Sequence, residues 1–436
     1  MIAYFSPAYL LAKFLNNVNL SLFLLVSVAV TTICAYSVFR RVFNTPQSRI
    51  QAPVYFCLMI LFSTLVYRGG IPVGVLPDLG IALFVVWGVI HMRQEVSSWI
   101  WISILLLIYF LFFSPDKLDI QFDNRYITVL KPFAYLIILY LLSASKVSTQ
   151  LRPVVYGLLI FYPFLLLWYM AMWWYGHGVF MPRPNFMIEN NFEIPPLLYC
   201  FIAIAFIYRD KDLRVFLLLA IGILLTGSRS GLVGLLAISV FYLFSLSRKK
   251  MILVLLAAAS AFVYVAYLRA SVSVPDAQNT NPIDRIQTFL RIYSFYNNSF
   301  IEILKYPLGV GIYQKIPVNI CNQFEGYADW FTGNFFNCDP LMLQSFVARA
   351  LYQFGIYVLV FIPIAFYLEL RKRMGWYLGL ITLIPILGAS FSVGGFSNGL
   401  AFGSLLVCLL IYQQVSPGLI SQACNNGKSH ETNQYA

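Results

Sequence analysis

The chain has 436 residues, of which 60% are hydrophobic and only 11% are charged. This balance excludes an ordinary soluble globular protein, in which about a quarter of the residues are charged. The net charge of +12 does not indicate a nucleic-acid partner, because the basic residues lie in short loops between long apolar runs. Composition therefore predicts an all-α polytopic membrane protein.

The apolar runs predict about 13 transmembrane helices, with a range of about 12 to 14. They lie near residues 20–38, 52–67, 74–90, 98–113, 127–144, 153–174, 195–208, 214–226, 231–247, 251–269, 344–369, 375–392 and 397–414. Residues 1–414 are thus expected to form a single integral membrane domain. Met1–Asn19 lacks the features of a cleavable signal peptide and predicts an interfacial helix or one further span. The polar tail 415–436 is expected to be disordered and cytoplasmic.

Basic clusters in alternate loops predict the topology. The positive-inside rule places these clusters on the cytoplasmic side. They are Arg40–Arg41, Arg93, Lys146–Arg152, Arg209–Arg214, Arg248–Lys250 and Arg371–Arg373. Because the clusters at 209–214 and 248–250 are both inside, the apolar stretch between them must cross the membrane twice. The turn in the middle of that stretch is therefore expected to face outward.

That turn contains an arginine, Arg229, within Thr226-Gly227-Ser228-Arg229-Ser230-Gly231. An arginine at bilayer depth costs about 2.5–3.5 kcal/mol on insertion scales and needs a partner or a water-filled cavity. Its small and hydroxylated neighbours predict a non-helical turn that lines such a cavity. The alternative is a short turn from which the arginine side chain reaches the membrane surface.

The outward loop at residues 270–343 is too long to be a simple connector. Within it, Pro282–Tyr306 predicts one amphipathic helix, with Asn281 as its N-cap. Its apolar residues are Ile286, Phe289, Leu290, Tyr293, Tyr296, Phe300, Ile301 and Leu304. This helix is expected on or near the membrane surface. The loop also contains Cys321 and Cys338, which form either a disulfide in an oxidising compartment or a pair of free thiols.

Four arginines of the predicted outward side are candidate anion-binding residues. The planar guanidinium group binds phosphate oxygens through two parallel hydrogen bonds, which lysine cannot reproduce. Arg183, Arg229, Arg291 and Arg349 together suit a lipid-linked pyrophosphate. The alternative is contact with lipid headgroups or ion pairs with acidic residues of the same loops.

Few residues on the same side can act as a base. Glu189 and Asp339 lie in polar loops where they can accept a proton, and His177 is a third candidate. No sequence motif for a metal, a nucleotide or a dinucleotide is present, so no cofactor is predicted.

Four segments resemble the superfamily of O-antigen polymerases and O-antigen ligases, and along the chain they follow one another in the order that this superfamily shows. Leu225–Leu232 is similar to its signature turn, and Arg183–Asn191 to the outward loop in which an arginine precedes a Phe-x-Glu turn. Arg291–Gly311 is similar to its arginine-led helix, which ends in Pro-Leu-Gly-x-Gly. Gln344–Ile356 resembles the stretch in which the ligases carry His-Asn before a Gly-Ile span. The similarity covers residues 180–370.

The resemblance implies a glycosyltransferase of the bacterial inner membrane with its active site facing the periplasm, which would make the 270–343 loop periplasmic. The donor would be a glycan on undecaprenyl pyrophosphate, and a second lipid-linked repeat unit would supply the acceptor hydroxyl. The four arginines would bind the pyrophosphate without a metal. Glu189 or Asp339 would orient or deprotonate the acceptor. Membrane lipid and a chain-length regulator of the polysaccharide are expected as further partners.

Three functions stay open at this point. Gln344 stands where the ligases carry their histidine, which favours a polymerase over a ligase that joins finished polymer to lipid A–core. The third function is a lipid-linked oligosaccharide flippase or transporter. That class commonly shows internal repeats and paired breaks in its spans, and the sequence shows neither. The sugar composition, the linkage and the type of surface polysaccharide are not specified by these residues.

Overall fold

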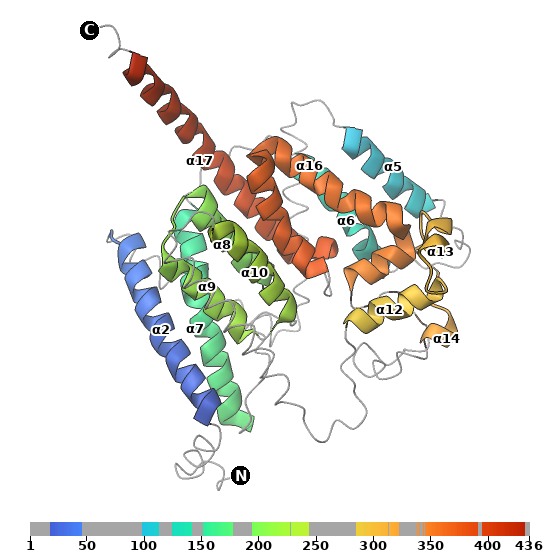
Figure 1. The fold of residues 1–436 in the computed structure, drawn as a ribbon, viewed down its shortest axis with the longest axis horizontal. Helices are drawn as coiled ribbons and strands as arrows, with labels where there is room; N and C mark the ends of the chain where they lie inside the picture. The colour runs from blue at the N-terminus through green and yellow to red at the C-terminus, as the bar shows by residue number, and fades with distance from the viewer. Residues whose placement is uncertain are drawn as a thin grey trace. The chain divides into compact units, whose positions relative to one another are not determined.

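The computed structural model describes residues 18–45, 98–112, 124–141, 151–177, 194–226, 228–243, 285–312, 314–321, 338, 340, 343, 345–390 and 395–431. Regular structure in these ranges is entirely helical, which confirms the predicted all-α class (Figure 1). Phe346–Ser390 is the one described helix that is long and apolar enough to cross a membrane, and several apolar helices of 10–17 residues accompany it. The number of spans stays a prediction.

The chain divides into two compact units, each described by itself. Unit 1 comprises residues 1–73, 147–272 and 408–436, and unit 2 comprises residues 74–146 and 273–407. The single membrane domain stays a prediction. The helix α17 (Gly399–Glu431) begins in unit 2 and ends in unit 1, and it continues into the segment for which the sequence predicts disorder.

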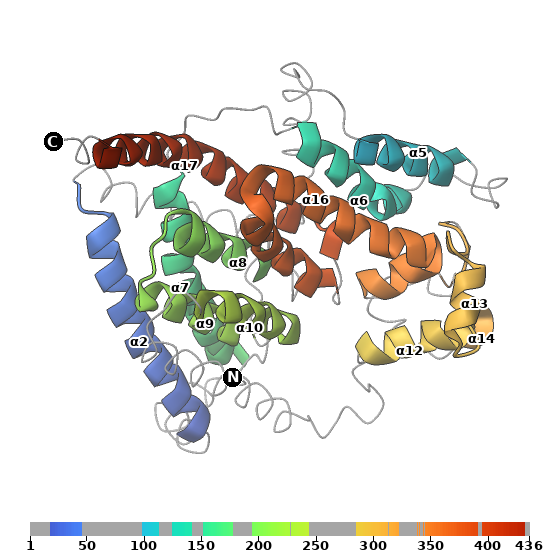
Figure 2. The ribbon, with the colours of Figure 1, turned by 45° about the horizontal axis from the view of Figure 1, so that its top comes forward.

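Unit 1 is a bundle in which α2 and α7 lie side by side (Figures 1 and 2). Its elements are α2 (Val18–Val42), α7 (Arg152–His177), α8 (Ile194–Ile202), the π-helical turn η4 (Ala203–Ile207), α9 (Leu213–Leu225) and α10 (Arg229–Leu243). The helix α9 packs on α2, α7, α8 and α10 and is the centre of the bundle. The buried rings of Phe201, Phe216 and Tyr242 lie within 5.7 Å of one another, centroid to centroid, and form part of its core.

Charged residues from segments far apart in sequence meet at one end of unit 1. Arg41 Nη2 of α2 lies 2.7 Å from Asp210 Oδ2, and its Nη1 lies 3.3 Å from Asp212 Oδ2. The Tyr156 hydroxyl of α7 also donates a hydrogen bond to Asp210. Residues 40–41 and 209–214, which the charge pattern assigns to one side of the membrane, thus lie together.

Asp212 is the N-cap of α9 and accepts a hydrogen bond from the Arg214 amide at 3.0 Å. Burial raises the pKa of the Asp212 carboxyl. Hydrogen bonds from Arg214 and the positive charges of Arg214 and Arg41 lower it, and their combined effect is larger than that of burial. The pKa of Asp212 therefore lies below its ordinary value of 3.8. Its ionised form contributes to stability above pH 3.8, and that contribution is lost as the pH falls through the lowered pKa.

We expect Asp212→Asn to be less stable than the wild type at pH 7, by about 1 kcal/mol or less, because the amide retains the cap but removes the charge. The difference should shrink as the pH falls below 3.8 and through the lowered pKa of Asp212, where the wild-type carboxyl becomes protonated. Thermal unfolding of the protein in detergent between pH 3 and 7 measures this. A difference that is the same at both ends of this range would contradict the electrostatic role.

Unit 2 is built around the long helix α16 (Phe346–Ser390). The other elements are α5 (Ser98–Phe112), α6 (Asn124–Leu141), α12 (Arg285–Phe295), α13 (Phe300–Lys305), α14 (Val318–Cys321) and the 3₁₀ turn η8 (Gly395–Ser397). The helix α16 packs on α6, α12, α13 and η8, and α5 packs on α6. Figure 2 shows α5 beside α6.

Two glycines interrupt α16. Gly355 has φ 76° and ψ 177°, and Gly375 has φ 80° and ψ 168°, so neither is helical. A Cβ at Gly379 would lie 2.9 Å from the backbone nitrogen of Arg371, so the helices on either side of Gly375 fold back against each other. The chain reverses where the sequence predicts the basic turn between two spans.

One correction concerns the amphipathic helix predicted over Pro282–Tyr306. Two helices, α12 and α13, occupy its described part, separated at Asn297 and Asn298, whose φ angles are 52° and 53°. Asparagine adopts this left-handed conformation more readily than most residues, and two in succession end the helix. The buried residues therefore include Ile292 and Ile303, which the uninterrupted helical spacing did not assign to the apolar face.

A buried ion pair within α16 lies next to α6. Arg373 Nη2 lies 2.7 Å from Glu369 Oε1, and the two side chains are only 8% and 4% exposed. The same Nη2 donates to the Tyr140 carbonyl at the end of α6 at 3.0 Å. Of these contacts, the one between the two helices is therefore the hydrogen bond from Arg373 to Tyr140, and Glu369 compensates the buried charge of Arg373 from within α16.

We expect Glu369→Gln to destabilise the protein by about 3–5 kcal/mol, because Arg373 would remain buried without its carboxylate. As the matched control, Glu302→Gln removes one partner of a more exposed pair with Lys305 and should cost about 1 kcal/mol or less. Thermal unfolding in detergent compares the two variants. Equal losses would show that the Glu369–Arg373 pair contributes no more than a surface pair.

Candidate functional site

Four of the seven predicted site residues lie in the part of the chain that the structure describes. Arg229 is the first residue of α10 and His177 the last residue of α7, both in unit 1. Arg291 lies on α12 and Arg349 on α16, both in unit 2. The other three, Arg183, Glu189 and Asp339, lie outside the described residues, as does Gln344.

The turn before Arg229 joins α9 to α10 through hydrogen bonds of its hydroxyl groups. The Thr226 hydroxyl donates to the Ile223 carbonyl at 2.6 Å, and the Ser228 hydroxyl accepts from the Gly231 amide at 3.3 Å. Both side chains are buried. Thr226 thus closes the end of α9, and Ser228 is the N-cap of α10. The hydroxyls expected to line a cavity therefore have a local role in ending one helix and starting the next.

Glycines of α10 allow it to lie directly on α8. A Cβ at Gly231 would lie 2.9 Å from Ile194 Cδ1, and one at Gly234 would lie 2.7 Å from Leu198 Cδ1. Ile194 is the first residue of α8, directly after the segment that contains Arg183 and Glu189. The packing therefore places Ile194, the first residue of α8, beside the first turn of α10, which begins with Arg229.

In unit 2 the helices of Arg291 and Arg349 contact each other. Ile292, next to Arg291, is fully buried in a cluster that includes Ala348, next to Arg349. Arg291 is partly exposed, whereas Arg349 is only 6% exposed. Arg349 Nη2 donates to the Ser397 hydroxyl at 2.8 Å, so η8 helps to hold the guanidinium in place. The structure thus brings the elements of these two predicted arginines together.

The loop Pro307–Gly311 lies directly on the break in α16. The Val310 amide donates to the Tyr352 carbonyl at 2.8 Å, and the Tyr357 amide donates to the Pro307 carbonyl at 3.4 Å. Gly309 has φ 74°, and a Cβ there would lie 2.5 Å from the carbonyl carbon of Gln353. Only glycine combines this conformation with so close an approach of two backbones. Two of the four similar segments therefore form one structural feature.

Polar contacts at the same place join the loop to α16. The Gln353 side chain donates to the Ile312 carbonyl at 3.2 Å, and the Tyr296 hydroxyl of the α12–α13 turn donates to the Leu351 carbonyl at 3.3 Å. Burial raises the pKa of Tyr296, so this donor remains protonated at neutral pH. Neither Gln353 nor Ser397 was predicted from the sequence as a residue of the site. A polar residue four positions after Arg349 in an apolar run was the available signal for Gln353.

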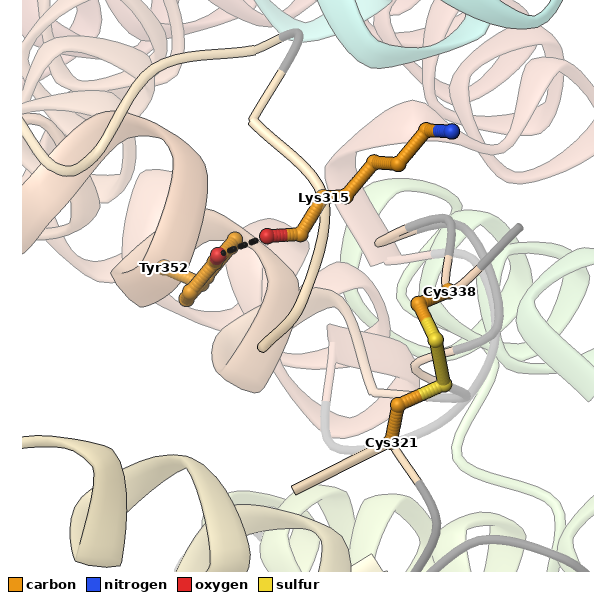
Figure 3. The surroundings of a disulfide bond; sticks show 4 residues. All are labelled: Lys315, Cys321, Cys338 and Tyr352. Atoms are coloured by element: carbon orange, nitrogen blue, oxygen red, sulfur yellow. Dashed lines mark hydrogen bonds between the residues drawn. A yellow bond between two sulfur atoms is a disulfide. The ribbon is translucent and has the colours of Figure 1, made fainter. Parts of the chain in front are cut away.

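The disulfide between Cys321 and Cys338 fastens the next part of the loop (Figure 3). The two Cα atoms are 5.6 Å apart. Of the two alternatives that the sequence left open, a disulfide and a pair of free thiols, the structure has the disulfide. Both cysteines belong to the cluster that contains Ile292 and Tyr352. The Tyr352 hydroxyl donates to the Lys315 carbonyl at 2.7 Å (Figure 3). The bridge therefore belongs to the core beside the Arg291 helix.

We expect Gly309→Ala to lower the unfolding temperature strongly, because the new methyl group meets backbone rather than a side chain that can move. Gly403→Ala is the matched control, since a Cβ at Gly403 of α17 meets nothing within 4 Å. It should leave stability unchanged or raise it by up to about 1 kcal/mol. Thermal unfolding of both variants in detergent tests this. Equal effects would contradict the close contact.

Among the described residues, no group of three or more His, Cys, Asp or Glu side chains is placed to hold a metal ion.

A comparison with protein families matches residues 215–360 to the O-antigen ligase family. The matched region includes Arg229, Arg291, Arg349 and the Pro307–Gly311 loop, so the resemblance found from the motifs is confirmed there. No curated protein matches the chain significantly. Over these residues the chain is therefore similar to enzymes of O-antigen polymerase or ligase type.

Proposed function

Starting from the O-antigen ligase family match over residues 215–360, we propose that this chain is a polymerase of lipid-linked oligosaccharide repeat units. The observation that carries the proposal is the contact of the two helices that bear Arg291 and Arg349 within the matched region. The polymerase would lie in the inner membrane with its active site facing the periplasm. Its substrates would be glycans on undecaprenyl pyrophosphate.

The arginines would act on the leaving group. In the transfer, an acceptor hydroxyl oxygen attacks the anomeric carbon of the donor glycan, and the bond from that carbon to the pyrophosphate breaks. The bonding electrons go to the pyrophosphate, which leaves on its lipid. Guanidinium groups that are already oriented stabilise this developing charge without a metal. Arg349 has such an orienting contact in its bond to Ser397.

The proton of the acceptor hydroxyl would go to a carboxylate. Glu189 and Asp339 are the proposed bases, and His177 is the third candidate. The fixed position of Ile194 on Gly231 supports a role for the segment before α8, which contains Glu189 and Arg183. The Cys321–Cys338 disulfide supports the periplasmic placement of the long loop, because disulfides persist in oxidising compartments.

Gln344 supports polymerisation over ligation, because the ligases of the family carry a histidine at this position. The ligase is the second candidate, since the family match covers both enzyme types. A strain that lacks the protein separates them. If the chain is the polymerase, this strain accumulates single repeat units on the lipid carrier. Complete polymer on the carrier in that strain would instead identify the ligase.

We expect Arg291→Ala and Arg349→Ala to reduce polymer formation at least about hundredfold, since each removes a charged donor from the leaving group. Arg229→Ala should do the same. Complementation of a polymerase-deficient strain, with electrophoresis of the lipopolysaccharide and immunoblots for expression, measures this. Arg371→Gln, an exposed arginine of α16, is the matched control and should give wild-type ladders. Full ladders from all three variants at normal expression would overturn the proposed role of these arginines.

A flippase or transporter is separated by reconstitution. Purified protein in vesicles should convert lipid-linked repeat units to polymer without an ion gradient. Movement of intact units across the bilayer without polymer would identify the transporter instead.

A further inference from the structure

The helix α13 has a row of exposed apolar side chains. Phe300, Ile301 and Leu304 are 58%, 70% and 42% exposed. Their spacing of i, i+1 and i+4 places them on one side of the helix. Three large apolar groups on one side of a six-residue helix form a continuous apolar patch, which calls for a partner.

The remaining residues of α13 are already paired or packed. Ile303 is buried in the cluster that α16 shares with α12. Lys305 and Glu302 form an ion pair at the side of the helix. The exposed patch is therefore distinct from the face that joins α13 to the core of unit 2.

The patch continues onto a candidate membrane span. Tyr306, the residue after α13, is exposed, and the next residue, Pro307, accepts a hydrogen bond from the amide of the exposed Tyr357. From Tyr357, the exposed residues Val360 and Ile364 continue at i+3 and i+7 along one side of α16. This side belongs to the described helix that is apolar and long enough to cross a membrane.

Acyl chains are the partner that suits such a row, because an apolar side of a membrane span faces lipid. Tyrosines are typical of the level at which acyl chains give way to headgroups. Tyr306 and Tyr357 lie where the α13 patch joins the row on α16. The junction of the α13 patch with α16 therefore has the residue type that a membrane–water interface favours.

We propose that α13 lies in the membrane–water interface on the outward-facing side of the membrane that the chain spans. Its side chains Phe300, Ile301 and Leu304 are inserted among the lipids. A surface helix of this kind inserts its apolar face about 5–10 Å into the headgroup boundary. Only a four-residue turn separates α13 from α12, so the anchor also sets the depth of Arg291. This second step rests on the proposed function, since it places Arg291 at the level of a lipid-linked pyrophosphate.

Quenching of an environment-sensitive fluorophore tests the membrane contact. We attach the fluorophore to Ile301→Cys and, as the matched control on the polar side of the same helix, to Glu302→Cys. The unsubstituted chain corrects for labelling of native thiols, of which Cys34, Cys200 and Cys408 are buried. In nanodiscs, spin-labelled lipid should quench the label at 301 at least about twofold more than the label at 302, and aqueous iodide should do the reverse.

Two results would overturn the membrane contact. If iodide quenches the label at 301 as strongly as the label at 302, the patch faces water. If neither quencher reaches the label at 301, the patch is covered by protein.

Polymer formation tests the second step separately. The double variant Phe300→Ser/Ile301→Ser should form about tenfold less polymer, because a small displacement of a substrate-positioning group lowers the rate steeply. Glu302→Gln should form as much as the wild type. Lipid quenching at 301 together with normal polymer from the double variant would overturn the role in setting the depth of Arg291. Lipid quenching in a wild-type protein that forms no polymer would instead leave the anchor standing and reject the proposed function.

Discussion

The close contact of two glycines, Gly309 and Gly355, is the constraint on which unit 2 depends. A Cβ at Gly355 would lie 2.3 Å from the backbone nitrogen of Gly309, so neither position tolerates a side chain. The contact ends the first helical segment of α16 and holds the loop after α13 against it. Backbone amides of Val310 and Tyr357 are satisfied by the same contact, so it serves both packing and hydrogen bonding.

In unit 1, a glycine also allows close packing next to the turn before Arg229. Thr226 and Ser228 satisfy the ends of two helices, and Gly231 lets the second helix approach Ile194. Capping by Thr226 and Ser228 and close packing at Gly231 thus explain these three residues of the turn.

Much of the fold followed from local patterns. Hydropathy predicted the helices, and the basic run at 371–373 predicted the chain reversal that occurs at Gly375. The break at Asn297 and Asn298 was not predicted. The helix propensity of asparagine is only modestly unfavourable, so two asparagines do not by themselves exclude a continuous amphipathic helix. The choice of conformation depends on how Ile292 and Ile303 pack in a shared cluster, and these contacts connect residues that are distant in sequence.

Residue type and spacing were enough to predict the helical class and to find the resemblance that the family match over residues 215–360 confirms there. These properties depend on transfer energies and local backbone preferences, which each segment carries with it. The side of α13 that is buried, the contact of the Arg291 helix with the Arg349 helix and the bond from Arg349 to Ser397 depend on tertiary packing. Such contacts are set by the simultaneous fit of several segments, and no single segment encodes them.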